Sequence, residues 1–167
     1  MRNIQENGWS RKAEVHPVVL GEKADILNIY GGNAGASLGK GWARIPESYV
    51  SQVPVLTLDR VLGDELDGKR ALILVDVEGA EFPMLKGGLR ALNHLPRPIW
   101  MVEIGSTEHQ PEGVLVNPNL VSTFELFYKF GYSATTANRH ENSVSLNEVM
   151  AVAEGERTFE THNFIFR

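Results

Sequence analysis

Residues 71–88, ALILVDVEGAEFPMLKGG, decide the fold that we expect for this chain. Residues 71–76 form an unbroken apolar run that ends in Asp76, a pattern typical of a central strand buried on both faces of a parallel sheet. Gly79 then precedes an amphipathic stretch, residues 80–92, in which apolar side chains recur at helical spacing. A buried strand that leads directly into a helix predicts a unit of an α/β fold.

Further strands and helices are predicted on both sides of this unit. The other predicted strands are residues 14–20, 26–30, 53–57, 98–104, 132–136 and 163–166. The other predicted helices are residues 58–62, 120–130 and 145–153, with Asn119 as a cap of the second. Because strands and helices alternate, we expect an open α/β sheet. A length of 167 residues favours one domain, residues 1–167.

The composition excludes several function classes. The chain has no cysteine, which rules out disulfides, thiolate metal sites, iron–sulfur clusters and a catalytic thiol. A net charge of −5 without a basic run argues against nucleic acid as a partner. No apolar run reaches the roughly 18 residues that a membrane span needs, and no secretion signal opens the chain. We therefore expect a cytoplasmic protein that binds neither nucleic acid nor a membrane.

Carboxylates gather where the two most apolar strands end. Asp76, Glu78 and Glu81 follow the first strand, and Glu103 lies near the end of the next. Ligands of open α/β sheets bind beyond the carboxyl ends of the strands, so this rim is the candidate site. If the first strand stays extended, Asp76 and Glu78 point to the same side. Such carboxylates can bind a polyol, take a proton or hold a hard cation.

Each carboxylate also has a purely structural interpretation. Glu81 can complement a helix N-terminus, which is worth about 0.3–1 kcal/mol. Asp76 can bond the backbone of a turn, and Glu103 can pair with a cation. A divalent cation at the rim, with hydrolase-like chemistry, is a further alternative, although no histidine accompanies the motif.

The other candidate motifs carry little chemistry. Residues 31–41, GGNAGASLGKG, do not match a phosphate-binding loop, because Ala34 and Gly41 replace its first glycine and its hydroxyl residue. We interpret this segment as a flexible surface loop. The five histidines lack zinc-ligand spacing, and His109 and His140 fall in predicted loops. The segment His140-Glu141-Asn142 is a candidate contributor to a pocket.

Four segments together resemble the FkbM family of S-adenosylmethionine-dependent methyltransferases. They are VPVLTLDRVL (53–62), ALILVDVEGAEFPMLKGG (71–88), PIWMVEIG (98–105) and FELFYKFGY (124–132). The resemblance implies a Rossmann-like methyltransferase sheet with the order 3-2-1-4-5-7-6, mostly parallel and with an antiparallel C-terminal strand. It also implies O-methylation of a sugar or another hydroxylated natural product, with S-adenosyl-L-methionine as the cofactor.

The same resemblance assigns roles to individual residues. Asp76 would lie near the methionine end of the cofactor, and Glu78 and Glu103 near the hydroxyl that accepts the methyl group; these three are the expected catalytic residues. Leu20 and Gly21 would lie near the adenine. Glu81 and His140 are the expected substrate-binding residues. No metal is expected.

The sequence departs from the family at its start. The glycine-containing loop after the family's first strand, and the acidic residue after its second, would both precede Met1. We therefore expect an N-terminally truncated domain in which an apolar strand has lost its neighbour. Exposed apolar edges invite pairing, so the remaining strands should pair directly or a homodimer should cover the edge. The alternative function is a non-catalytic remnant that self-associates and does not bind the cofactor.

Overall fold

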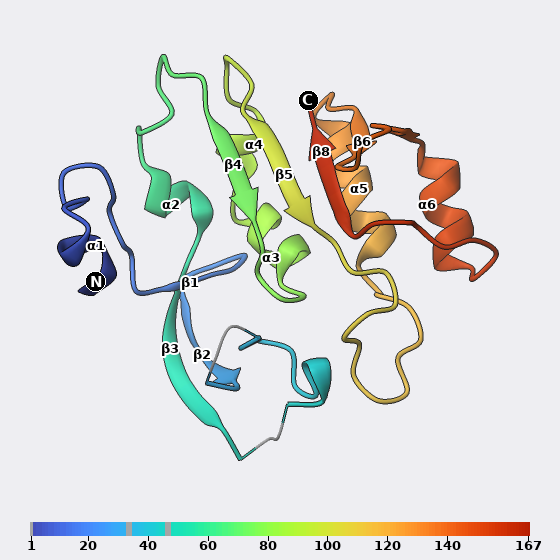
Figure 1. Cartoon of the computed structure of the whole chain (residues 1–167), viewed down its shortest axis with the longest axis horizontal. Helices are drawn as coiled ribbons and strands as arrows, with labels where there is room; N and C mark the ends of the chain where they lie inside the picture. The colour runs from blue at the N-terminus through green and yellow to red at the C-terminus, as the bar shows by residue number, and fades with distance from the viewer. Residues whose placement is uncertain (1, 33–34, 46–47) are drawn as a thin grey trace.

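A computed structural model describes residues 2–32, 35–45 and 48–167, which form two sheets with helices beside them (Figure 1). Met1 and the loop positions Asn33 and Ala34 lie outside the described residues, so the loop interpretation is not tested at those two positions. Helix α1 (Arg2–Glu6) opens the described chain. Among the described residues, no helix is long and apolar enough to cross a membrane.

The first sheet has three strands in the order β1-β3-β2. The strands are β1 (Val19–Leu20), β2 (Asp25–Tyr30) and β3 (Val50–Leu56). Strand β1 runs parallel to β3 and β2 runs antiparallel to it. Only the last two residues of the predicted strand 14–20 are in β1. A short 3₁₀ turn, η1 (Trp42–Arg44), lies between β2 and β3.

The second sheet has five strands in the order β4-β5-β8-β6-β7. The strands are β4 (Leu72–Val75), β5 (Ile99–Glu103), β6 (Ala134–Thr136), β7 (Ser143–Val144) and β8 (Asn163–Phe166). The β4–β5 pair is parallel, and β8 joins β5 and β6 with antiparallel pairing. The expected antiparallel C-terminal strand is therefore present. The expectation of mostly parallel strands is wrong for the described residues, because only the β1–β3 and β4–β5 pairings are parallel.

The helices form where the periodicity predicts them, with one break. They are α2 (Leu58–Leu62), α3 (Glu81–Lys86), α4 (Leu89–Leu92), α5 (Leu120–Lys129) and α6 (Leu146–Ala153). The single helix predicted over residues 80–92 is divided at Gly87 and Gly88. A Cβ at Gly87 would lie 2.1 Å from the carbonyl oxygen of Gly21, so the chain passes too close for a side chain there.

The N-termini of α5 and α6 differ in their side-chain caps. Ser145 and Glu148 form a reciprocal capping box at α6. Asn119 makes no side-chain cap at α5, contrary to expectation; its backbone N–H instead donates to Asn117 Oδ1 at 2.9 Å. Gly131, with φ +79°, follows the end of α5, where a left-handed glycine commonly stops a helix.

The hydrophobic core lies between the five-stranded sheet and the helices behind it. Figure 1 shows β4, β5 and β8 in front of α3, α4 and α5, with no helix drawn in front of these strands. Trp100 and Val102 of β5 face the helices and are fully buried, together with Phe124 and Phe127 of α5. Apolar burial on this one face is the main stabilising contribution.

Strand β4 does not have the predicted central position. It forms one edge of its sheet, and the strands of the first sheet do not pair with it. Leu72 and Leu74 are 68% and 67% exposed, and Ile99 beside them on β5 is 43% exposed. Burial on both faces is therefore wrong for β4, because helices cover only one side of this sheet. Direct pairing of the remaining strands with the exposed edge is also wrong.

Candidate functional site

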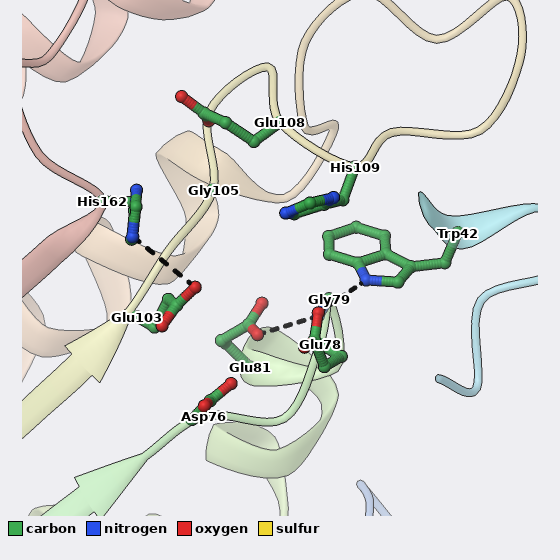
Figure 2. A pocket seen from close by; sticks show the side chains of 10 residues that line it. All are labelled: Trp42, Asp76, Glu78, Gly79, Glu81, Glu103, Gly105, Glu108, His109 and His162. Atoms are coloured by element: carbon green, nitrogen blue, oxygen red, sulfur yellow. Dashed lines mark hydrogen bonds and ion pairs between the residues drawn. The ribbon is translucent and has the colours of Figure 1, made fainter. Parts of the chain in front are cut away.

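The candidate site is a pocket at the carboxyl ends of β4 and β5 (Figure 2). The parallel register pairs Val75 with Val102, so Asp76 and Glu103, one residue further along each strand, come to the same edge. Glu78 and Glu81 line the same pocket. The structure thus brings together all four carboxylates that the sequence placed at this rim.

A tight turn, rather than strand alternation, brings Glu78 to the pocket. Strand β4 ends at Val75, and the backbone then adopts positive φ angles of +49° at Glu78 and +88° at Gly79. The strand therefore does not stay extended to Glu78, the condition for strand alternation, although Asp76 and Glu78 still line the same pocket. A positive φ at a non-glycine residue is unfavourable, and such residues concentrate at functional sites.

Trp42 forms one wall of the pocket and holds this turn. Its indole Nε1–H donates to Glu78 Oε2 at 2.8 Å, and Ser37 Oγ donates to the Glu78 carbonyl at 2.6 Å. The indole lies so close to Gly79 that a Cβ there would be 2.6 Å from the ring. Trp42 and Ser37 are 7% and 2% exposed. The interpretation of residues 31–41 as a surface loop is therefore wrong at Ser37. Trp42, the residue that follows this segment, lies at the site.

Glu81 is the most buried carboxylate of the pocket, at 5% exposed. Burial raises its pKa to about 7, and the neighbouring charges of Glu78 and Asp76 add to this, while the N–H of Gly79 opposes it. That N–H donates to Glu81 Oε1 at 2.9 Å. The other oxygen points into the space between Glu103 and Trp42 in Figure 2. With a pKa of about 7, Glu81 is able to take up or release a proton near neutral pH.

The side chains of Glu108, His109 and His162 also line the pocket. His162 Nε2 lies 3.8 Å from Glu103 Oε1. Although burial opposes ionisation of Glu108, backbone N–H groups of its own loop hold the pKa of this carboxyl below its ordinary value. Glu108 Oε2 accepts from the N–H groups of Ser106 and Thr107, so it orders the loop. Sequence reasoning missed Glu108 and His162, which have no motif around them.

A wider groove adjoins the carboxylate pocket. The two share His109, whose ring centroid lies 6.1 Å from that of Trp42. The groove has a volume of about 1190 Å³, and it runs between the segment around η1 and the loop after β5. The carboxylate pocket is smaller, at about 90 Å³. The pocket therefore accommodates a single functional group, whereas the groove has room for the remainder of a ligand.

The other predicted site residues lie elsewhere. Leu20 ends β1, and the carbonyl of Gly21, the next residue, lies close to Gly87; neither residue lines the pocket or the groove. His140 is exposed in the turn between β6 and β7 and also lies outside both. Within the described residues, no group of three or more acidic or histidine side chains is arranged to hold a metal ion.

S-Adenosylmethionine fits this site only in part. The carboxylates suit the cationic sulfonium end of the molecule. Pockets that enclose a whole cofactor usually measure about 300–1,000 Å³. The 90 Å³ pocket is too small for the nucleoside, and Leu20 and Gly21 line neither this pocket nor the groove. The charge of the pocket thus suits the cationic end of the cofactor, and the pocket does not enclose the nucleoside.

Comparison with known proteins decides the family. The profile of the family described as "Methyltransferase FkbM domain" matches residues 5–134, which include both sheets' parallel pairs and most of the pocket. The chain belongs to this family. No curated protein and no solved structure gives a match. The resemblance carried by the segment around Asp76 is confirmed, and the domain is one of a methyltransferase family.

Proposed function

We propose that this FkbM-family domain uses S-adenosyl-L-methionine to methylate a hydroxyl group of a sugar or related natural product. The observation that carries the proposal is the convergence of Asp76, Glu78, Glu81 and Glu103 in one pocket. Family membership supports methyl transfer, and the pocket supports the nature of the acceptor. Carboxylates accept hydrogen bonds from hydroxyl groups, and a flat indole such as that of Trp42 packs against the apolar face of a sugar ring.

The carboxylates bind and orient the acceptor and take its proton. Glu78 is held in place by the Trp42 N–H, and Glu103 lies across the pocket from it, so a hydroxyl between them is positioned on two sides. Removing the hydroxyl proton makes the oxygen a better nucleophile. The cofactor, when bound, supplies a methyl group on a sulfonium. The groove beyond His109 receives the rest of the acceptor.

The first experiment is a calorimetric titration of the purified chain with S-adenosylhomocysteine. Binding at micromolar concentration is the result expected from the proposal. No binding by a sample that circular dichroism shows to be folded would contradict it. That result would favour the alternative, a non-catalytic remnant of the fold.

A pair of matched variants tests the role of the pocket. Glu103→Gln removes a pocket carboxylate, and Glu125→Gln removes an exposed carboxylate of α5 that does not line the pocket. With a panel of sugars as acceptors, Glu103→Gln should lower the turnover number by about 100-fold or more, the range of general acid–base catalysis. Glu125→Gln should leave the rate unchanged. Equal rates for the two variants would remove Glu103 from the mechanism.

A further inference from the structure

The outer edge of β4 is an apolar strand edge without a neighbour. Strand β4 pairs with β5 on one side, and no described strand lies on its other side. Leu72 and Leu74 are 68% and 67% exposed at this edge. Strands of parallel sheets are normally buried, and natural proteins cover or charge an edge of this kind. The edge is therefore a surface suited to an additional strand.

The direction of the backbone groups fixes which residues an additional strand would meet. The Ala71 carbonyl accepts from the Ile99 N–H at 2.9 Å and so points toward β5. Alternate residues of a parallel pair direct both backbone groups to the same side. Ala71 and Ile73 thus face β5, and Leu72 and Leu74 present their N–H and C=O groups to the open edge. An incoming strand must form its hydrogen bonds with these two leucines.

The edge is complementary to itself in the antiparallel direction. Residues opposite each other in an antiparallel ladder must both face the gap between the strands. A two-fold axis through Ile73 satisfies this condition, because it places Leu72 opposite Leu74 of a second copy. The leucines of both copies then lie on the same, uncovered face of the sheet. Such an interface is isologous, as in most homodimers.

Charges at the two ends of β4 favour the same arrangement. Arg70 precedes the strand and Asp76 follows it. Both are exposed, and neither forms an ion pair with another described residue. The two-fold axis through Ile73 places Arg70 of each copy opposite Asp76 of the other. Opposite charges across a strand pair stabilise it, whereas a parallel pairing would set like charges together.

We propose that β4 pairs antiparallel with β4 of a second copy of this chain, about a two-fold axis at Ile73. The pairing brings Arg70 of the second copy beside Asp76, so each subunit contributes a cation to the other's carboxylate pocket. It extends each five-stranded sheet into one continuous sheet of both copies. The proposal does not depend on methyl transfer, because it concerns the edge strand and is tested without cofactor or acceptor.

Disulfide trapping tests the register directly, because the chain has no cysteine of its own. The two Ile73 residues would face each other at the axis as a non-hydrogen-bonded pair, with Cα atoms about 4.5 Å apart, within the range of a disulfide. Ile73→Cys should therefore form a covalent dimer under mild oxidation. In Leu74→Cys each cysteine faces Leu72 of the other copy, so cross-linking should be several-fold weaker. Equal trapping of both variants, or of neither, would overturn the proposal.

Charge reversal provides a second test that leaves the apolar strand intact. Arg70→Asp should raise the dissociation constant of the dimer by about tenfold or more, since the change places like charges together at both ends of the pair. Arg70→Asp combined with Asp76→Arg should restore the dimer. Leu115→Lys, at a residue that is 84% exposed in the loop after β5, is the matched surface control.

Light scattering across a concentration series gives the dissociation constant of each folded variant. The expected pattern is a dimer for the unmodified chain, Leu115→Lys and the double variant, and a monomer for Arg70→Asp alone. An unmodified chain that stays monomeric at its solubility limit would overturn the proposal. So would a dimer that is indifferent to Arg70→Asp, because it would use another surface.

Discussion

The two sheets of the molecule differ in how they are stabilised. In the five-stranded sheet, Trp100, Phe164 and Phe166 are completely buried. In the three-stranded sheet, whose strands are all described, Val55 is the one buried strand residue, and Ile26 is 67% exposed. Buried apolar area is the largest favourable contribution to folding, so the five-stranded sheet supplies most of the stability.

The difference shows that stability and site construction come from different parts of the chain. The five-stranded sheet provides the carboxylates, but the pocket wall comes from Trp42, in the weakly buried N-terminal region. Segments with few buried apolar contacts open at low free energy, and binding segments are drawn from them. We therefore expect the N-terminal sheet to exchange amide hydrogens faster than the five-stranded sheet, while the contacts of Trp42 slow exchange locally.

The largest expected effect is a difference in unfolding free energy between two alanine variants, one in the core of the five-stranded sheet and one in the three-stranded sheet. The Phe124 ring lies 5.0 Å from that of Phe164 and 5.4 Å from that of Phe166, centroid to centroid. Phe124→Ala should lower the free energy of unfolding by about 3–5 kcal/mol, because it leaves a cavity. Ile26→Ala in the three-stranded sheet should change it by less than about 0.5 kcal/mol. Urea unfolding of both variants measures the difference. Equal losses of unfolding free energy would show that the two sheets contribute equally to stability.

The second effect concerns the pH dependence of the pocket. Burial raises the pKa of Glu81 from 4.5 to about 7, so between these values the folded state binds a proton that the unfolded state has lost. The free energy of unfolding should therefore fall as the pH rises from about 5 to 7, by up to about 3 kcal/mol from this group. Below about pH 4.5, Glu81 is protonated in both states and contributes no pH dependence.

Glu81→Gln removes this contribution. The variant should be more stable than the unmodified chain at pH 8, and it should lose most of the decline between pH 5 and 7. Glu125→Gln, which changes an exposed carboxylate, should retain that decline. Urea midpoints at several pH values give the comparison. A decline that persists unchanged in Glu81→Gln would assign it to another group.

The regular elements of the five-stranded half follow from local patterns. Apolar periodicity locates α5 and α6, and the Ser145–Glu148 pair marks the start of α6. The convergence of Asp76 and Glu103 follows from the general rule that parallel strands end at one rim. The helices are predictable because nearby residues determine them, and the rim is predictable because the rule holds for parallel strands in general.

The features that were not predicted from the sequence depend on contacts between residues far apart in the chain. An apolar run such as residues 71–76 indicates that the strand gains from burial, but it does not identify the neighbour that buries it. The sequence of an edge strand such as β4 therefore has the same pattern as that of a central strand. The role of Trp42 rests on contacts with Glu78 and Gly79, more than thirty residues away. A lone tryptophan next to a glycine-rich loop was the available signal, and it is a weak one.

The smallest expected effect isolates the contact between the two regions at the site. Gly79 and Gly113 have nearly the same backbone angle, φ +88° and φ +84°, so Gly→Ala imposes similar backbone strain at both. At Gly79 the new Cβ would also lie 2.6 Å from the Trp42 ring, whereas at Gly113 nothing lies within 4 Å. Gly79→Ala should therefore lower the free energy of unfolding by about 1–2 kcal/mol more than Gly113→Ala.

Hydrogen exchange shows whether that difference arises at the indole. A displaced Trp42 loses its hydrogen bond to Glu78, so the segment around Ser37 and Trp42 should exchange faster in Gly79→Ala than in Gly113→Ala. The five-stranded sheet should be protected equally in both variants. If the two variants unfold and exchange alike, the indole moves aside without a loss of stability. The N-terminal region would then be less firmly attached to the pocket than the Trp42–Glu78 hydrogen bond implies.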